Sequence, residues 1–162
     1  MLKILFVCTG NTCRSPMAEY LCKAELTGAE LPFEVEVSSA GIAAVAGEKI
    51  SELTGQVLSA EGFDTDKHYA RVVDRDLVDD SDLILVMTAD HLLQLRARFP
   101  YADGKMYLLK EFAGFTEDGL NIADPIGSDL QIYRLVLEEI RDCVKKIIIK
   151  FREAPDDENS SG

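Results

Sequence analysis

A cysteine and an arginine near the start of the chain have the spacing C-x5-R. They belong to the run Cys8-Thr9-Gly10-Asn11-Thr12-Cys13-Arg14-Ser15. A thiolate can attack phosphorus, and a planar guanidinium can hold two phosphate oxygens at once. Gly10 and Asn11 tolerate unusual backbone angles, which allow the intervening backbone N–H groups to form an oxyanion-binding nest. The run therefore predicts a phosphate-binding loop over residues 8–15, called the phosphate loop below.

The phosphate loop lies between a predicted strand and a predicted helix. The apolar run 4–7 predicts a buried strand, and Ser15-Pro16 predicts a helix that starts with Ser15 as its cap. Free N–H groups at a helix start favour a bound anion and a thiolate at Cys8, to which Ser15 can donate. An isolated C-x5-R pair can also be a core cysteine and a surface arginine. The flanking strand, glycine and Ser-Pro start favour the chemical interpretation.

The remaining patterns predict the fold. Apolar runs predict strands over 4–7, 83–87 and 106–109, and a more alternating pattern predicts a strand over 33–37. Helical periodicity predicts helices over 16–27, 48–61, 89–98 and 128–151. The last helix starts with Ser128-x-x-Gln131, the pattern of a capping box. Strands that alternate with helices predict an α/β single domain with a central four-stranded parallel sheet and helices on both faces. Ligands of such sheets bind beyond the carboxyl ends of the strands, where the phosphate loop lies.

Composition and charge narrow the classes of function. The chain has 162 residues and a net charge of −12, which disfavours partners such as nucleic acid or an anionic membrane. No apolar run is long enough to span a membrane, and the first residues do not resemble a signal peptide, so we expect a cytoplasmic protein. The sequence does not determine the oligomeric state, for which a monomer is the expectation. Two histidines without ligand spacing predict no metal and no cofactor. We expect a folded domain over 1–152 and a disordered acidic tail over 153–162.

Several segments together resemble a known family. The run Val7-Cys8-Thr9-Gly10-Asn11-Thr12-Cys13-Arg14-Ser15-Pro16-Met17-Ala18-Glu19 resembles the signature of the low-molecular-weight protein tyrosine phosphatases. Val37–Gly41, His68–Arg71, Asp82–Thr88 and Asp124-Pro125 resemble later family segments, in family order. The resemblance implies the family fold and a hydrolase that acts on phosphorylated protein through a phosphocysteine intermediate. It implies Cys8 as nucleophile, Arg14 and the phosphate loop as phosphate ligands, and Asp124 as general acid.

The resemblance also implies supporting residues. Ser39 matches a family serine that supports the loop through the asparagine at the position of Asn11. His68 and Arg71 match residues behind the loop, and we expect His68 to be a packed, hydrogen-bonded residue.

The sequence predicts separate roles for the remaining cysteines and for His91. Cys13 matches a family cysteine that can close a reversible disulfide with Cys8 under oxidation. Cys22 and Cys143 fall on apolar helix faces and are expected to pack in the core. His91 matches nothing in the family pattern and is expected on the solvent side of its helix.

The substrate is indicated by Thr12 and by the residues after Asp124-Pro125. Family members that resemble tyrosine phosphatases carry an isoleucine-like residue at the position of Thr12 and aromatic residues after Asp-Pro. Bacterial protein arginine phosphatases carry threonine at that position and glycine at the position of Gly127, although they tend to have phenylalanine where this chain has Ile126. Thr12 therefore favours phosphoarginine, with phosphotyrosine as the alternative. Thr12 can also be a variation without meaning for the substrate.

Two further classes of protein agree less well with the sequence. An arsenate reductase resembles this family around the loop but needs additional cysteines, and residues 60–100 contain none. A non-catalytic module that binds phosphorylated protein would not need Cys8, Arg14 and Asp124 together.

Overall fold

The structure is a computed structural model, and it describes residues 1–116 and 119–155. Four strands form one parallel sheet in the order β2-β1-β3-β4. They are β1 (Leu2–Cys8), β2 (Val35–Gly41), β3 (Leu83–Val86) and β4 (Met106–Leu108). The predicted α/β fold with a four-stranded parallel sheet is confirmed. Most of the predicted tail, residues 156–162, lies outside the described residues.

The second strand is displaced from its predicted range, 33–37. It pairs with β1 from Val35, opposite Leu2, to Gly41, opposite Cys8. The strand therefore continues through the polar pair Ser38-Ser39, which ended the apolar pattern in the sequence. Ser39 is buried there because its hydroxyl is hydrogen-bonded within the protein, so polarity did not mark an exposed turn.

Seven helical segments surround the sheet. They are α1 (Arg14–Leu26), α2 (Glu52–Ser59), α3 (Arg75–Asp80), α4 (Ala89–Arg98), the 3-10 helix η1 (Pro100–Lys105), α5 (Leu109–Phe112) and α6 (Leu130–Arg152) within the described residues. The four predicted helices correspond to α1, α2, α4 and α6. The segments α3, η1 and α5 were not predicted, because six residues or fewer are too few for a periodic apolar pattern.

Three predicted helix starts are wrong. The helix predicted from residue 48 begins at Glu52, because Ser51 caps it and Lys49 forms an isolated β-bridge with Tyr69. Cys13 occupies the N-cap of α1, so Ser15 lies inside the first turn, where its hydroxyl points into the phosphate loop. In α6 the cap is Asp129, whose carboxylate accepts a hydrogen bond from the backbone N–H of Ile132 at 3.1 Å. Asp129 occupies the position next to the first helical residue, so Ser128 lies one residue too early to form a capping box.

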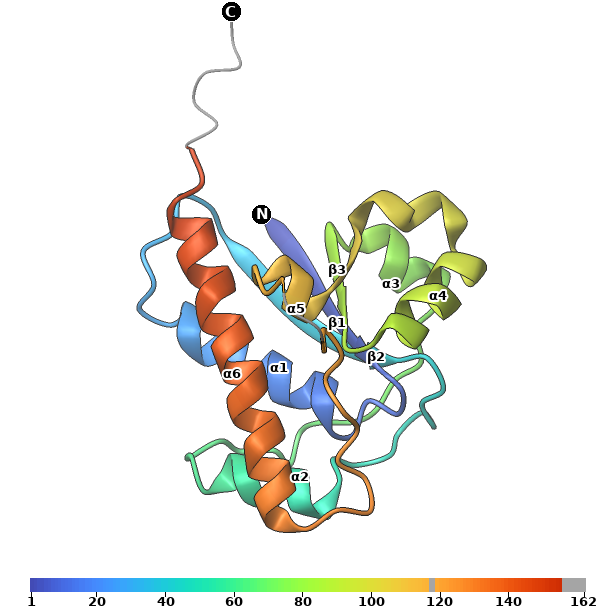
Figure 1. Cartoon of the computed structure of the whole chain (residues 1–162), viewed down its shortest axis with the longest axis vertical. Coiled ribbons are helices and arrows are strands. Elements are labelled where there is room, and N and C mark those ends of the chain that lie inside the picture. Colours follow the sequence, from blue (N-terminus) through green and yellow to red (C-terminus); the bar gives the residue numbers. More distant parts are fainter. Residues whose placement is uncertain (117–118, 156–162) are drawn as a thin grey trace, which may run out of the picture.

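The sheet separates two hydrophobic clusters, as alternate residues of β1 show. Ile4, Phe6 and Cys8 belong to the cluster beneath α1, α2, α5 and α6, whereas Leu5 and Val7 belong to the cluster beneath α4. Figure 1 shows α6 and α1 on one side of the sheet and α3 and α4 on the other. Helices on both faces are therefore confirmed.

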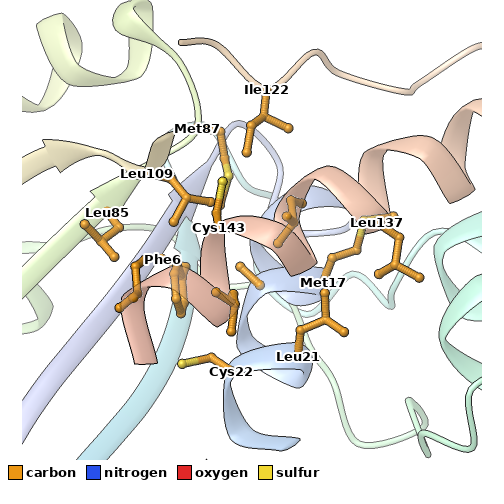
Figure 2. Packing of buried hydrophobic residues seen from close by; sticks show 14 of the residues in the cluster. Phe6, Met17, Leu21, Cys22, Leu85, Met87, Leu109, Ile122, Leu137 and Cys143 are labelled. Carbon is orange, nitrogen blue, oxygen red and sulfur yellow. The ribbon is translucent and has the colours of Figure 1, made fainter. Parts of the chain in front are cut away.

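The cluster between the sheet and α6 fixes the position of α1. Figure 2 shows Phe6 and Leu85 of the sheet near Met17 of α1 and Cys143 of α6, all of them buried. Burial of such side chains stabilises the fold by about 1.5–3 kcal/mol each. The start of α1, which follows the phosphate loop, is thereby held against a packed core. Within the described residues, no helix has the length and apolar character needed to cross a membrane.

Candidate active site at the carboxyl ends of the strands

The ends of three strands meet around the phosphate loop. Backbone hydrogen bonds join Ile42 N–H to the Cys8 carbonyl at 2.9 Å and Met87 N–H to the Val7 carbonyl at 3.2 Å. The chain beyond β2 and β3 is thus fastened to the end of β1. This is the edge of the sheet where parallel α/β folds place their ligands.

Asn11 is the centre of the loop's internal hydrogen bonds. It is buried and has a φ of 56°, a left-handed conformation that asparagine tolerates better than most residues. Its side-chain amide donates to Ser15 Oγ and Ser39 Oγ, both at 2.9 Å. Its Oδ1 accepts from the backbone N–H of Arg71 at 3.1 Å, and its carbonyl accepts from His68 Nε2 at 2.7 Å. The loop is therefore held in shape by protein contacts on four sides.

Cys8 lies at the floor of the loop with 2% of its surface exposed. Its Sγ is 2.9 Å from Ser15 Oγ. Ser15 Oγ accepts from Asn11, and its single proton has two acceptors within reach, the Cys8 sulfur at 2.9 Å and the Ala40 carbonyl at 3.3 Å. A hydroxyl donor at this distance stabilises a sulfur anion during attack and again when the sulfur departs.

Arg14 is buried beside the loop, with its guanidinium held at two nitrogens. Nη1 donates to the Ile122 carbonyl at 2.8 Å, and Nη2 donates to Thr9 Oγ1 at 3.4 Å. Among the described residues, the buried Nε of Arg14 has no hydrogen-bond partner. Buried polar groups are normally satisfied, so this free N–H fits a site for a phosphate oxygen.

Asp124 faces this arginine from the loop before α6. Its Oδ2 is 3.6 Å from Arg14 Nη2, and its Oδ1 accepts from the backbone N–H of Ile126 at 3.1 Å. The loop that carries it is anchored near β3 by a hydrogen bond from Ile122 N–H to the Met87 carbonyl at 2.9 Å. Asp124 is partly exposed, so its carboxyl group is open to a substrate. The structure thus brings together Cys8, Arg14 and Asp124.

The two predicted selectivity residues belong to the two loops that carry the catalytic candidates, Thr12 to the phosphate loop and Ile126 to the loop of Asp124. Thr12 is partly exposed within the phosphate loop, and its Oγ1 lies 3.8 Å from Cys13 Sγ. Ile126 is 64% exposed, and Gly127 continues the turn with a φ of 82°. The Asp124 loop therefore presents a small aliphatic surface where an aromatic residue would present a ring.

Cys13 faces away from the centre of the loop, toward α2 and α6. Its Sγ is 3.1 Å from Ser51 Oγ, the residue that caps α2, and 3.9 Å from Tyr133 Oη. All four cysteines are free thiols, and the pairing of Cys8 with Cys13 stays a prediction. Burial raises the pKa of Cys22 and of Cys143 to about 12, which leaves those thiols protonated and unreactive.

The predicted exposure of His91 is wrong. Its side chain is 4% exposed, and its Nε2 lies 2.8 Å from Thr9 Oγ1 in the phosphate loop. Burial, and next the positive charge of Arg14, lower the pKa of His91 to about 4, so its ring is neutral at pH 7. His91 shares the buried face of α4 with Leu92 and Leu95, and that spacing was the signal available in the sequence.

Four further contacts of the site were not anticipated. The Ser39 hydroxyl donates to Glu19 at 2.7 Å, which connects the serine that supports the loop to α1. Ser51 and Tyr133 surround Cys13, and the Ile122 carbonyl holds Arg14. Each of these partners is distant in sequence from the group that it contacts, so local patterns could not reveal it.

Gly41, the last residue of β2, provides a test of how closely the loop is packed. A Cβ at this position would lie 2.5 Å from the Thr9 carbonyl oxygen and 2.9 Å from the Asn11 nitrogen. Gly41→Ala must therefore displace the loop backbone, and we expect it to cost about 1–3 kcal/mol of unfolding free energy and to weaken binding of inorganic phosphate. Urea denaturation and calorimetric titration measure the two effects. Gly104→Ala is the control, since a Cβ there meets nothing within 4 Å. If the two variants had the same unfolding free energy and the same affinity for phosphate, the loop backbone would accommodate the added Cβ without cost.

Comparison with known proteins points to the family that the phosphate-loop signature resembles. The family model for low molecular weight phosphotyrosine protein phosphatases matches residues 3–156. A protein-arginine-phosphatase of Geobacillus stearothermophilus is 38% identical over 150 residues, which cover 93% of this chain and 96% of the relative. A probable low molecular weight protein-tyrosine-phosphatase, EpsP of Ralstonia nicotianae, is 35% identical over 92% of this chain and 95% of its own length.

A solved structure has the same fold. It is that of a cysteine-to-serine mutant of the YwlE arginine phosphatase, with a phosphorylated active-site serine. It matches with a TM-score of 0.87 and 29% identity, over 94% of this chain and 97% of that chain. The resemblance found in the phosphate loop thus extends over the sequence and the fold, and the chain belongs to the low molecular weight phosphotyrosine protein phosphatase family.

Proposed function

We propose that this protein phosphatase prefers phosphoarginine in its protein substrates and hydrolyses it through a phosphocysteine intermediate. The observation that carries the preference is Thr12, a partly exposed, hydroxyl-bearing residue of the phosphate loop, together with the absence of an aromatic residue at positions 126 and 127. Membership of the phosphatase family supports the proposed type of reaction.

In the first step the Cys8 thiolate attacks phosphorus. Arg14, through Nε and Nη2, and the loop N–H groups hold the equatorial oxygens, where charge concentrates in the transition state. The phosphorus–nitrogen bond breaks, and Asp124 gives its proton to the departing guanidine nitrogen. The products of this step are an unmodified arginine side chain in the substrate protein and a phosphoryl group on Cys8.

In the second step water hydrolyses the phosphocysteine. The Asp124 carboxylate takes a proton from water, and the oxygen forms a bond to phosphorus as the bond to Cys8 Sγ breaks. Ser15 donates to the departing sulfur at 2.9 Å, and inorganic phosphate leaves. The phosphorylated active-site serine in the YwlE mutant supports a covalent intermediate in that relative, and we assign the same role to Cys8 of this chain.

Two features favour arginine over tyrosine as the group that bears the phosphate. The hydroxyl of Thr12 can orient water or accept a hydrogen bond from a guanidinium, which an isoleucine cannot do. Ile126 and Gly127 offer no aromatic wall to stack on a phenyl ring. Phosphotyrosine is the second candidate, because a relative named as a tyrosine phosphatase matches with 35% identity, close to the 38% of the arginine phosphatase.

Replacement of Thr12 with isoleucine tests the preference. We expect Thr12→Ile to shift the ratio of kcat/KM for phosphoarginine over phosphotyrosine by about 10–100-fold toward tyrosine, because a polar contact to the guanidinium is lost. Matched peptides that differ only in the phosphorylated residue provide the measurement.

Thr27→Ile is the matched control, since Thr27 is exposed at the far end of α1. It should leave the ratio unchanged. A wild-type protein that prefers phosphotyrosine, together with an unmoved ratio in Thr12→Ile, would refute the arginine preference while leaving the phosphatase reaction intact.

A further inference from the structure

His91 contacts the phosphate loop from outside it. It lies in the first turn of α4, 82 residues from Thr9 in the sequence, and its Nε2 is 2.8 Å from Thr9 Oγ1. The imidazole is almost fully buried, whereas the loop residue that it contacts is exposed. Its Nδ1 has no partner among the described residues, so the hydrogen bond to Thr9 is the polar contact that its ring makes there.

The Thr9 hydroxyl connects this histidine to Arg14. Guanidinium nitrogens only donate, so Thr9 Oγ1 accepts from Arg14 Nη2 at 3.4 Å. A hydroxyl can accept one hydrogen bond and make a second one at the same time, so Thr9 can contact His91 in either neutral tautomer of the ring. Arg14, Thr9 and His91 therefore form a continuous chain of hydrogen bonds from the loop to α4.

The orientation of Arg14 depends on few contacts. The Ile122 carbonyl holds Nη1, and among the residues that the structure describes the polar neighbours of Nη2 are Thr9 and Asp124. In the proposed reaction Asp124 turns to the leaving group, so Thr9 is then the protein contact that steadies Nη2. We propose that His91 is a positioning residue which, through Thr9, keeps the Arg14 guanidinium turned toward the transferring phosphoryl group.

This role rests on the proposed phosphate binding by Arg14 but not on the choice between arginine and tyrosine. A misaligned guanidinium loses more interaction with the trigonal-bipyramidal transition state than with bound substrate, because charge on the equatorial oxygens is stabilised by precise donors. Loss of His91 should therefore lower kcat more than it raises KM.

The experiment compares His91→Leu, His91→Gln, Thr9→Val and the double variant Thr9→Val/His91→Leu with p-nitrophenyl phosphate as substrate. We expect His91→Leu to lower kcat by about 10-fold and to weaken inhibition by orthovanadate, a transition-state mimic, by a similar factor. Inhibition by inorganic phosphate should change far less. His91→Gln, whose amide reaches the position of Nε2, should recover most of kcat. The double variant should be no slower than the slower single variant.

Controls separate this role from a loss of folding. Leu93→Ala changes an exposed residue of the same helix and should leave all constants unchanged, while urea denaturation of each variant gives its stability. An unchanged kcat in His91→Leu, additive losses in the double variant, or equal weakening of vanadate and phosphate would each overturn the proposal. A preference for phosphotyrosine in the matched-peptide assay would overturn the substrate proposal and leave this one standing.

Discussion

Replacement of Cys8 with serine is expected to lower kcat by about 10⁴-fold or more. The hydroxyl of serine is a far weaker nucleophile than a thiolate, and it occupies the same place 2.9 Å from Ser15 Oγ. Any phosphoryl group that it accepts becomes a stable ester, so the variant should gain one phosphoryl group on incubation with substrate. Steady-state kinetics with a phosphorylated peptide measures the loss, and intact-mass spectrometry detects the modified protein.

Cys22→Ser is the matched control for this exchange. Cys22 lies in the core between the sheet and α6, where burial raises its pKa to about 12. The control should lose stability, because a hydroxyl is buried there, and retain kcat. Turnover by Cys8→Ser within 10-fold of the wild-type value would rule out covalent catalysis by this residue.

Replacement of Asp124 with asparagine is expected to lower kcat on phosphorylated peptides by about 10²–10⁴-fold. An amide cannot protonate the leaving nitrogen or oxygen and cannot accept a proton from water. The loss in the first step should be much smaller with p-nitrophenyl phosphate, because nitrophenolate departs without a proton. Single-turnover kinetics with the two substrates isolates that step, and the ratio between them identifies the general acid.

Asp64→Asn is the control for a change of loop structure. Asp64 accepts a hydrogen bond from the backbone N–H of Asp66 at 3.0 Å, the same local contact that Asp124 makes with Ile126. If the turn alone mattered, Asp124→Asn would slow both substrates equally. That outcome would remove the assignment of Asp124 as general acid.

The fold was largely predictable because its strands and longer helices carry apolar patterns of sufficient length. The helix predicted over 89–98 coincides with α4, and the strand predicted over 83–87 ends one residue beyond β3. The range of β2 was not predictable from polarity, because Ser39 is buried through hydrogen bonds to Asn11 and Glu19, which come from other elements. The cap of α6 was wrong by one residue for a local reason, since Ser128 and Asp129 are both good capping residues.

The candidate site likewise contains residues that the local sequence predicts and residues that only the tertiary fold brings together. Cys8 and Arg14 are brought together by a loop of adjacent residues, so their spacing was sufficient to predict their proximity. Asp124 reaches Arg14 only through the tertiary fold, and it was found through the resemblance to the family. His91 is buried, and its hydrogen-bond partner Thr9 comes from a distant segment of the chain. A prediction from helical periodicity counts histidine as a polar residue and therefore places it on the exposed face of the helix.

The contact between Cys13 and Tyr133 has an optical consequence. The chain contains no tryptophan, so its intrinsic ultraviolet emission comes from its five tyrosines. The phenol oxygen of Tyr133 lies 3.9 Å from Cys13 Sγ, so one of these tyrosines contacts a residue of the phosphate loop directly. A chemical change at Cys13 alters the surroundings of this one fluorophore directly. The molecule therefore carries an intrinsic fluorophore beside the phosphate loop, and a modification of Cys13 is expected to change that tyrosine's share of the emission.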